Sequence, residues 1–349
     1  MTTHRAAVLG GTGYGGGEMI RRLLRHPQVE LVRVTSIDHV GEPLSAVHPN
    51  LEGQTDLRFE HLGWRRAARD VDVVLLGLPH EVSLEAVPEL ARSEARIVDM
   101  SAAFRLPTAD AYAERYGRAH PAPDLLPRFV YGLPELDREA IAGAGYVANP
   151  GCFATCVQLA LAPWVRSGPQ IPRAQVVAMT GSSGSGSEPR ATTHHPVRHG
   201  NLRAYGALRH VQSHEMEEQL RALGAPELEL AFVPVSAPLS RGILAVCTTE
   251  VPAEWTLEAC VERLSEAYAR ERLVRVPARR GPEVVAVAHS AYAEVGVEVG
   301  PVRGGRRTAS WLAALDNLIK GGAGQAIQNM NLMLGLPETT ALDAPGAFP

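Results

Sequence analysis

Apolar runs of strand length alternate with helical segments through the first 150 residues of the chain. Such runs occur at residues 6–9, 29–34, 71–76 and 96–98. Residues 18–24 and 81–91 instead repeat their apolar side chains at the helical period. Strands that are buried on both faces and separated by helices are typical of a parallel sheet covered on both sides. The pattern predicts a Rossmann-type, doubly wound α/β domain over residues 1–150.

The pattern changes after residue 150. Helical periodicity is found at residues 152–165 and 215–223, and strand-like runs occur at residues 175–180, 229–235, 242–250 and 284–289. Strands in succession with few helices between them predict an α+β domain with a mostly antiparallel sheet, here over residues 151–317. Helical periodicity returns at residues 323–336.

The composition agrees with a soluble protein of two domains. A chain of 349 residues is too long for one ordinary core, and 45% hydrophobic residues leave no room for wholesale disorder. A net charge of -4 gives no reason to expect a nucleic-acid partner. The four cysteines form no CxxC pair, and no apolar run approaches the ~20 residues of a membrane-spanning helix. We therefore expect reduced thiols and a cytoplasmic location.

One short region is rich in positive charge and histidine. It contains Arg190, His194, His195, Arg198, His199, Arg203, Arg209 and His210. These side chains suit an anionic ligand, and a solvated loop face explains them equally well.

A glycine-rich loop follows the first predicted strand. Residues 10–17 read GGTGYGGG and satisfy GxGxxG through Gly11, Gly13 and Gly16. Glycines between a strand and a helix let the backbone approach a pyrophosphate, which the helix N–H groups then bind. A merely tight turn needs only one or two glycines. The loop therefore predicts a nicotinamide dinucleotide site.

The end of the second strand indicates which dinucleotide is preferred. An acidic residue there bonds the ribose hydroxyls of NAD, whereas an arginine receives the 2′-phosphate of NADP. Asp38 lies at this place, so the residues alone favour NAD.

Cys152 differs from the other three cysteines in its surroundings. It follows Asn149-Pro150-Gly151 and opens the apolar helix, whereas Cys156, Cys247 and Cys260 lie inside apolar segments. The helix dipole lowers the pKa of a thiol at a helix N-terminus. Cys152 is thus the candidate nucleophile. With Cys156 it could supply two metal ligands, but no second pair completes a site, so no metal is expected.

A thiolate nucleophile needs a proton-transfer partner and groups that hold the leaving group. His210 and His214 are candidates for the first role, and spacing alone does not choose between them. For the second role, Ser101 and Arg105 offer a hydroxyl and a guanidinium. Ser182, Ser183 and Gly184 add hydroxyl and backbone donors, which together predict a phosphate nest.

These motifs resemble the N-acetyl-γ-glutamyl-phosphate reductases and their lysine-branch relatives, which reduce 2-aminoadipate 6-phosphate bound to a small carrier protein. The resemblance spans nearly the whole chain. It rests on GGTGYGGG (10–17), LPH (78–80), DMSAAFRL (99–106), YGLPE (131–135), NPGC (149–152), SRGIL (240–244) and LDNLIKGG (315–322). It implies that a C-terminal helix, residues 318–349, packs on the Rossmann domain, and that the protein forms dimers or tetramers.

The resemblance also implies a mechanism and a set of site residues. Cys152 would attack the acyl carbonyl and expel phosphate, and hydride transfer to the thioester would give a semialdehyde. NADP is the cofactor of the family as a whole. The positions expected to contact it are Gly11, Thr12, Gly13, Tyr14, Gly15, Ser36, Ile37, Asp38 and Asn317. Those expected to contact the substrate are Ser101, Arg105, Asn149, Ser182, Ser183, Glu215 and Arg241.

Two positions depart from the family pattern. Many members show H-R-H-x-x-E where this chain has residues 210–215, and the second histidine, usually taken as the acid/base, is Gln212 here. Either His210 or His214 must then take over its role, or activity is impaired. Members also commonly carry an arginine near Ile37 and Asp38 for NADP.

Segments 48–53, 194–205 and 342–349 look more like the lysine-branch enzymes, so the sequence favours carrier-linked 2-aminoadipate 6-phosphate as substrate. A basic loop would also suit an acidic carrier protein. The alternative is N-acetyl-γ-glutamyl phosphate in arginine biosynthesis, or both substrates. Two further hypotheses are a semialdehyde dehydrogenase that acts without phosphate and a non-catalytic dinucleotide-sensing protein, which Gln212 would favour.

Overall fold

The computed structural model describes residues 3–167 and 172–348. The chain forms two compact units, residues 1–151 with 322–343 and residues 152–321 with those from Ala344 on. None of the helices in the described ranges is long and apolar enough to cross a membrane.

The first unit contains a seven-stranded sheet in the order β3-β2-β1-β4-β5-β7-β6. Its strands are β1 (His4–Leu9), β2 (Val29–Thr35), β3 (Phe59–Glu60), β4 (Val73–Leu76), β5 (Arg96–Asp99), β6 (Phe129–Tyr131) and β7 (Tyr146–Ala148). Each neighbouring pair runs parallel. Residues 6–9 and 73–76 are fully buried because both faces of the central strands are covered. The predicted Rossmann-type sheet is confirmed.

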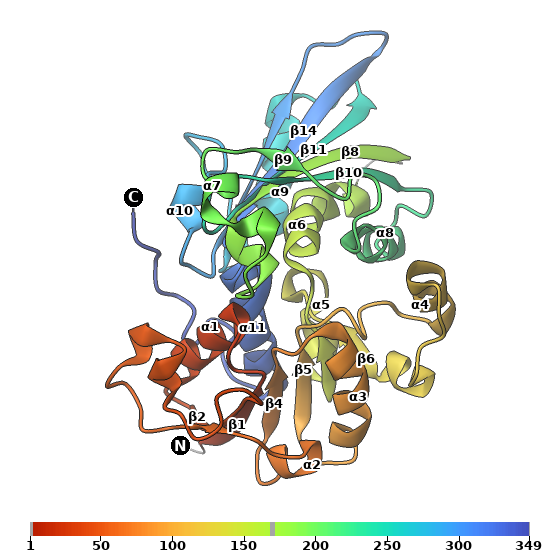
Figure 1. The fold of residues 1–349 in the computed structure, drawn as a ribbon. Helices are drawn as coiled ribbons and strands as arrows, with labels where there is room; N and C mark the ends of the chain where they lie inside the picture. The colour runs from red at the N-terminus through yellow and green to blue at the C-terminus, as the bar shows by residue number, and fades with distance from the viewer. Residues whose placement is uncertain (1–2, 168–171, 349) are drawn as a thin grey trace. The chain divides into compact units, whose positions relative to one another are not determined.

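The helices of this unit are α1 (Tyr14–Leu23), α2 (Trp64–Ala67), α3 (His80–Leu90), α4 (Ala109–Tyr116), α5 (Pro134–Ala142) and α11 (Gly324–Met333). The core between the sheet and α3 is formed by Leu9, Val74, Leu76, Leu84 and Val87, among others. α11 comes from the far end of the chain, yet it lies beside α1 and contacts α5 and β5 (Figure 1).

The predicted C-terminal helix over residues 318–349 is too long. A short π-helical turn, Ile319–Ala323, precedes α11, which ends at Met333. The residues from Ala344 on belong to the second unit. There Gly346 lies so close to the carbonyl of Ala288 that a side chain would not fit.

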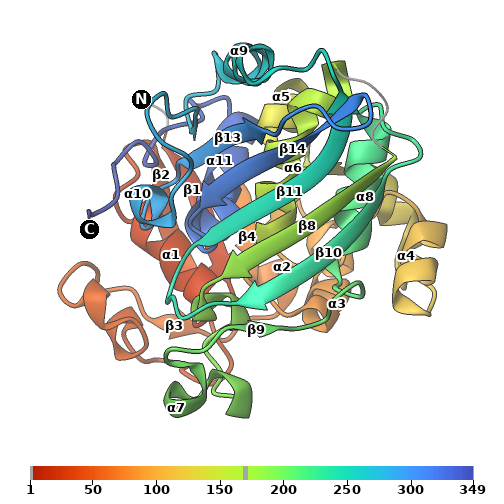
Figure 2. The same cartoon turned by 90° about the horizontal axis from the view of Figure 1, so that it is seen from above.

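The second unit contains a seven-stranded mixed sheet in the order β12-β13-β14-β11-β8-β10-β9. Its strands are β8 (Arg173–Thr180), β9 (Arg203–Ala204), β10 (Glu229–Ser236), β11 (Ile243–Pro252), β12 (Val274–Arg275), β13 (Ala293–Val299) and β14 (Arg306–Leu315). Figure 2 shows β14, β11, β8 and β10 side by side. The pairs β8–β10 and β12–β13 are parallel and the other four are antiparallel. The expectation of a mostly antiparallel sheet is confirmed.

The helices of the second unit are α6 (Cys152–Ser167), α7 (His195–Arg198), α8 (Gln212–Ala222), α9 (Leu257–Tyr268) and α10 (Val284–Val287). α6 packs on β11 and β14, and α8 lies against α6. The predicted strand at residues 284–289 is wrong, because residues 284–287 form α10 and His289 has a positive φ of 64°. A short apolar run has no periodicity that separates a strand from a helical turn.

Candidate functional site

The glycine-rich loop connects β1 to α1 at the carboxyl edge of the first sheet. Gly10 has φ of +79°, and a Cβ on Gly16 would lie 2.7 Å from the carbonyl oxygen of Gly10. Both glycines are therefore required by the turn itself. The backbone N–H groups of a helix's first turn have no partner inside the helix, so α1 directs donors toward the loop.

Gly13 has a different reason to be glycine. A Cβ built on Gly13 would meet no atom within 4 Å, so no protein contact forbids a side chain there. Open space beside first-turn N–H groups is what the pyrophosphate of a dinucleotide needs. The loop is held from outside by His48, whose Nε2 lies 2.7 Å from the carbonyl oxygen of Gly11. The sequence did not predict this role for His48, because its partner Gly11 lies 37 residues away along the chain.

The end of β2 lies next to this loop. Thr35 accepts hydrogen bonds from the N–H groups of Gly10 and Gly11, at 3.4 and 3.0 Å. The Ser36 hydroxyl accepts from the N–H groups of Asp38 and His39, both at 3.2 Å. Ile37 and Asp38 are exposed in the turn that follows. The structure thus brings the predicted loop and β2 positions together in one unit.

Arg58, which the sequence did not predict as a site residue, lies directly before β3 and contacts the same turn. The Arg58 guanidinium donates to the carbonyl of Gly41 at 2.8 Å and is exposed. Since Gly41 is only three residues beyond Asp38, a positive charge is present in this region although none is adjacent in sequence.

Ser101 is engaged within the first unit. Its hydroxyl donates to Asp99 at 2.7 Å and accepts from the N–H of Ala103 at 3.1 Å. Burial raises the pKa of the Asp99 carboxyl, which also accepts from Ser83 at 3.2 Å. The Ser101 side chain therefore stabilises the turn after β5.

Arg105 and Asn149 are close together in the same unit. Arg105 Nε donates to the carbonyl of Asn149 at 2.8 Å, and Nη2 donates to that of Met100 at 2.7 Å. The buried Asn149 side chain accepts from Asn329 at 3.0 Å and donates to the carbonyl of Gly322 at 3.3 Å. Asn149 thus connects the two places where the chain leaves and re-enters this unit.

In the second unit, Cys152 is the first residue of α6 and is partly exposed, whereas the other three cysteines are buried. Burial raises the pKa of Cys156 and Cys247, and that of Cys260 to about 11. These three thiols are protonated at neutral pH. A Cβ on Gly321 would lie 2.8 Å from Cβ of Cys152, so glycine is needed at 321 for the chain to pass beside the thiol residue.

His210 is packed among aromatic rings beside the start of α6. Its ring centroid lies 5.4 Å from those of Phe153 and Phe232 and 5.8 Å from that of Tyr205. Nδ1 of His210 accepts from the N–H of Gln212 at 3.3 Å, which favours the tautomer with the proton on Nε2. The pKa of Tyr205 is raised to about 12, mainly by burial and also by the nearby Cys152. Tyr205 is a neighbour of the thiol that the site prediction missed.

Gln212 occupies the position where many family members carry histidine, and it has a structural contact. Its Oε1 accepts from the N–H of Ala154, two residues after Cys152, at 3.0 Å. Gln212 therefore satisfies one donor in the first turn of the thiol helix. His214 lies further along α8, and its buried Nδ1 has no hydrogen-bond partner among the described residues. Glu215 follows it and is buried.

The predicted backbone nest at residues 182–184 is wrong. The N–H groups of Ser182, Ser183 and Gly184 donate to the carbonyls of Leu239, Ser240 and Gly181 at 2.8, 3.0 and 3.4 Å. These N–H groups are already used in hydrogen bonds within the unit, because the loop pairs with the segment before β11. The Ser183 hydroxyl instead accepts from Asn317 Nδ2 at 3.0 Å.

Asp316 and Asn317 organise the segment after β14. Asn317 Oδ1 accepts from the N–H of Gly242 at 2.7 Å. The fully buried Asp316 carboxylate accepts from the N–H of His289 at 2.7 Å and lies 3.8 Å from Arg241. Ser183, Arg241 and Asn317 are thus brought together in the second unit, whereas Ser101, Arg105 and Asn149 belong to the first.

Two family profiles match the chain. Residues 5–144 match the semialdehyde dehydrogenase NAD binding domain, and residues 152–317 match the semialdehyde dehydrogenase dimerisation domain.

Relatives of the same length include the N-acetyl-gamma-glutamyl-phosphate reductase of Desulforudis audaxviator, 41% identical with 99% of each chain covered. A Thermomicrobium roseum protein with the provisional name LysW-L-2-aminoadipate 6-phosphate reductase is 40% identical, with 98% of each chain covered. Among solved structures, aspartate semialdehyde dehydrogenase II of Vibrio cholerae superposes with a TM-score of 0.71 at 17% identity, covering 96% of this chain and 99% of that one. That of Candida albicans, solved with NADP, gives 0.70 at 15%, covering 95% and 99%.

Proposed function

Because this chain belongs to the N-acetyl-γ-glutamyl-phosphate reductase group of the semialdehyde dehydrogenase family, we propose that it reduces N-acetyl-γ-glutamyl phosphate to the semialdehyde. It is an NAD(P)-dependent oxidoreductase with a Rossmann-type cofactor domain. The hypothesis of a non-catalytic sensor has no support among the named relatives, which are reductases.

The observation that carries the proposal is the position of Cys152. It is the partly exposed thiol at the first residue of α6, where the helix dipole stabilises a thiolate. The thiolate attacks the acyl carbonyl, the C–O bond to phosphate breaks, and inorganic phosphate leaves. Bound NADPH supplies the hydride that reduces the resulting thioester. The Cys152 sulfur then leaves the tetrahedral carbon, which becomes the aldehyde.

We assign the proton transfer to His210 in preference to His214. The His210 ring contacts Phe153, the residue after Cys152, and its Nε2 carries the proton in the favoured tautomer. Hydride transfer leaves a negative charge on the former carbonyl oxygen, so a group near the thiol must donate a proton to this oxygen and take it back when the sulfur leaves. Loss of turnover in His210→Asn, with His214→Asn active, is the expected result. The reverse pattern would transfer the role to His214.

Arg58 is the residue that we expect to recognise NADP. An arginine near the adenosine ribose receives the 2′-phosphate of NADP. Arg58 is fixed to the turn after Asp38 through the carbonyl of Gly41. In Arg58→Gln we expect kcat/KM with NADPH to fall at least tenfold while that with NADH changes little, since a charge-assisted bond is worth about 1.5–3 kcal/mol. Equal losses with both cofactors would exclude this role.

Carrier-linked aminoadipyl phosphate is a second candidate substrate. The segment at residues 190–209, which includes α7 and β9, is mostly exposed, and it combines basic side chains with exposed Leu202 and Leu208. Basic and apolar side chains on one segment suit an acidic protein that delivers the substrate. One relative at 40% identity is named for this reaction.

The two substrates can be compared directly. The purified protein with NADPH is offered free N-acetylglutamyl phosphate and carrier-bound aminoadipyl phosphate, with Cys152→Ser as the control. A higher kcat/KM for the free substrate supports the arginine-branch proposal. A preference for the carrier-bound substrate that falls in Arg203→Glu and Arg209→Glu would support the second candidate.

We propose that the second unit also forms a homodimer through its sheet. Val177, Val246 and Leu312 lie opposite one another on β8, β11 and β14. All three are only partly buried, and Val177 is 41% exposed. A row of apolar side chains on one sheet face suits burial against a second copy. Val177→Lys should shift the protein toward monomer in sedimentation, and an unchanged mass would contradict this interface.

A further inference from the structure

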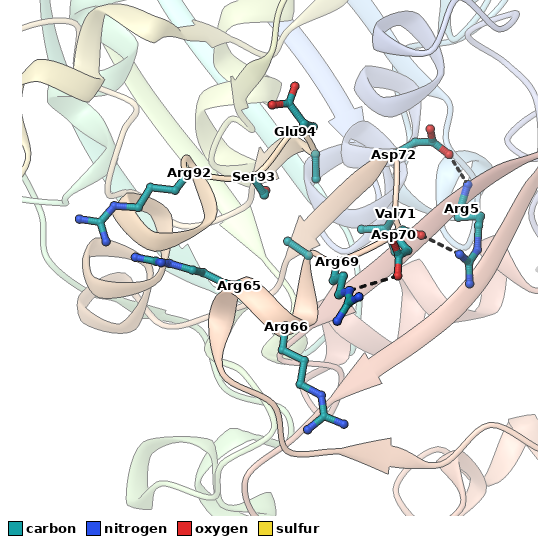
Figure 3. Close-up of a pocket in the computed structure, with 12 residues that line it drawn as sticks. Arg5, Arg65, Arg66, Arg69, Asp70, Val71, Asp72, Arg92, Ser93 and Glu94 are labelled. Carbon is teal, nitrogen blue, oxygen red and sulfur yellow. Dashed lines mark hydrogen bonds and ion pairs between the residues drawn. The ribbon is translucent and has the colours of Figure 1, made fainter.

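An open cavity lies at the amino edge of the first sheet, whereas the glycine loop follows the carboxyl end of β1. Its volume is about 910 Å³. It is formed by the start of β1, the turns after α2 and α3, and the residues before β4 (Figure 3). Small-molecule sites in proteins have volumes of about 300–1,000 Å³. The proposed reaction uses none of the residues that line this cavity.

Arginine dominates the charge of the lining. Five arginines and three acidic residues line the cavity: Arg5, Arg65, Arg66, Arg69 and Arg92, with Asp70, Asp72 and Glu94. Two of the carboxylates are engaged locally. Asp72 accepts from the backbone N–H of Arg5 at 2.7 Å, and Asp70 lies 3.5 Å from Arg69. The Asp70–Arg69 pair cancels one charge of each sign, whereas Asp72 keeps its negative charge and is held by a backbone donor.

Two of the arginines have no carboxylate partner in the described ranges of the chain. The Arg5 guanidinium donates to the backbone carbonyl of Asp70 at 2.8 Å, and this contact leaves its charge uncompensated. Asp70 has φ of 57°, a left-handed conformation that directs this carbonyl toward Arg5. Arg66 forms no ion pair with any residue that the structure describes, and it is exposed at the rim.

Arg65 and Arg92 are held as a pair by one carboxylate. Glu89 on α3 accepts from Arg65 Nε at 2.8 Å and from Arg92 Nη1 at 2.6 Å. Two guanidinium groups share a single negative charge, so one positive charge remains. In Figure 3 both side chains extend in the same direction, away from Arg5 at the other end of the cavity. An ordered pair of arginines loses less entropy when it binds an anion than two mobile ones.

We propose that this cavity binds a small polyanion, a molecule with at least two phosphate or carboxylate groups spaced along its frame. A guanidinium group can form two parallel hydrogen bonds to a phosphate or to a carboxylate. The arginines are spread along the rim in Figure 3, with Arg65 and Arg92 at one end and Arg5 at the other. Because they do not converge on one point, a ligand with separated charges satisfies them better than a single phosphate ion.

The test is calorimetric titration with two probes, inorganic tripolyphosphate and citrate. The protein is saturated with NADP⁺ so that the glycine loop is filled. In Arg65→Gln/Arg92→Gln we expect binding to weaken at least tenfold, because charge-assisted bonds of about 1.5–3 kcal/mol are lost. Arg25→Gln, which removes an exposed arginine outside the cavity, is the matched control and should bind as the wild type does.

A variant of opposite sign separates binding from misfolding. Glu89→Gln removes the shared negative charge and keeps an acceptor oxygen for one of the two arginines. We expect it to bind the probes about fivefold more tightly, the effect of one charge at about 4 Å in water. Binding of either probe, weakened in the arginine variant and strengthened in Glu89→Gln, supports the site. Absence of binding, or equal affinity in wild type and Arg65→Gln/Arg92→Gln, would overturn it.

Discussion

The chain has two glycine-rich loops after a strand, and the structure gives them different properties. In the loop at residues 10–17, the space beside Gly13 is open, and no side chain in the described part of the chain caps the first turn of α1. In the loop at residues 181–187, the N–H groups of residues 182–184 are bonded to carbonyls of the same unit. Glycine content alone therefore does not make an anion site. What matters is whether the backbone donors remain unpaired after folding.

The steric role of each glycine follows from the same comparison. A Cβ on Gly16 or on Gly181 would lie 2.7 Å from backbone atoms, so both positions require glycine. Gly13 and Gly184 have room for a methyl group. Substitutions at these four positions should therefore separate stability from ligand binding.

Gly16→Ala should have the largest effect. Its methyl group would overlap the backbone of Gly10 and Gly11, so we expect a loss of about 1–3 kcal/mol in unfolding free energy and weak NADPH binding. Denaturant unfolding and fluorescence titration measure the two quantities. Gly63→Ala, at an open position before α2, is the control. Unchanged values of both would show that the turn is not constrained as described.

Gly181→Ala should destabilise the second unit by a similar or slightly smaller amount. The methyl group would overlap the backbone of Ser240 and Arg241. It would therefore break the backbone hydrogen bonds between the two segments, and we expect the free energy of unfolding to fall by about 1–3 kcal/mol. Gly184→Ala, whose Cβ would meet Thr180 at an ordinary 3.6 Å, serves as the matched control. If the two variants unfold at the same denaturant concentration, the tight contact at Gly181 is not important.

Gly13→Ala should lower cofactor affinity without lowering stability. The new methyl group contacts no protein atom but occupies the space into which the pyrophosphate would fit. We expect NADPH to bind about tenfold more weakly, or about 1.4 kcal/mol. The unfolding midpoint should remain that of the wild type. Normal affinity in this variant would place the pyrophosphate elsewhere.

Ser183→Ala should have the smallest effect. It removes the bond from Asn317 to the Ser183 hydroxyl, which is worth about 1 kcal/mol of stability. If the loop is structural, KM for the acyl phosphate should change less than twofold relative to Ser185→Ala, an exposed control. A tenfold rise in KM would instead show that Ser183 contacts the phosphate of the substrate.

The sequence sufficed where function depends on neighbours along the chain. The first loop lies between a strand and a helix that periodicity alone identifies, and Cys152 is marked by the Pro-Gly entry to its helix. The sequence did not suffice where partners are distant. Residues 182 and 183 pair with residues 239 and 240, and Gln212 reaches the N–H of Ala154, 58 residues away. No local pattern encodes such contacts. The strand predicted at residues 284–289 failed for a different reason, because a short apolar run fits a strand and a helical turn equally well.

The central claim is the Cys152 thioester, and it can be trapped. The protein is mixed with N-acetylglutamyl phosphate without NADPH at about pH 8, where burial keeps the other three thiols protonated. Intact-mass and peptide analysis then locate any acyl group while phosphate release is counted. We predict one acyl group per chain on Cys152, one equivalent of phosphate, and neither in Cys152→Ser. Phosphate release without acylation of Cys152, or an active Cys152→Ser variant, would contradict the account.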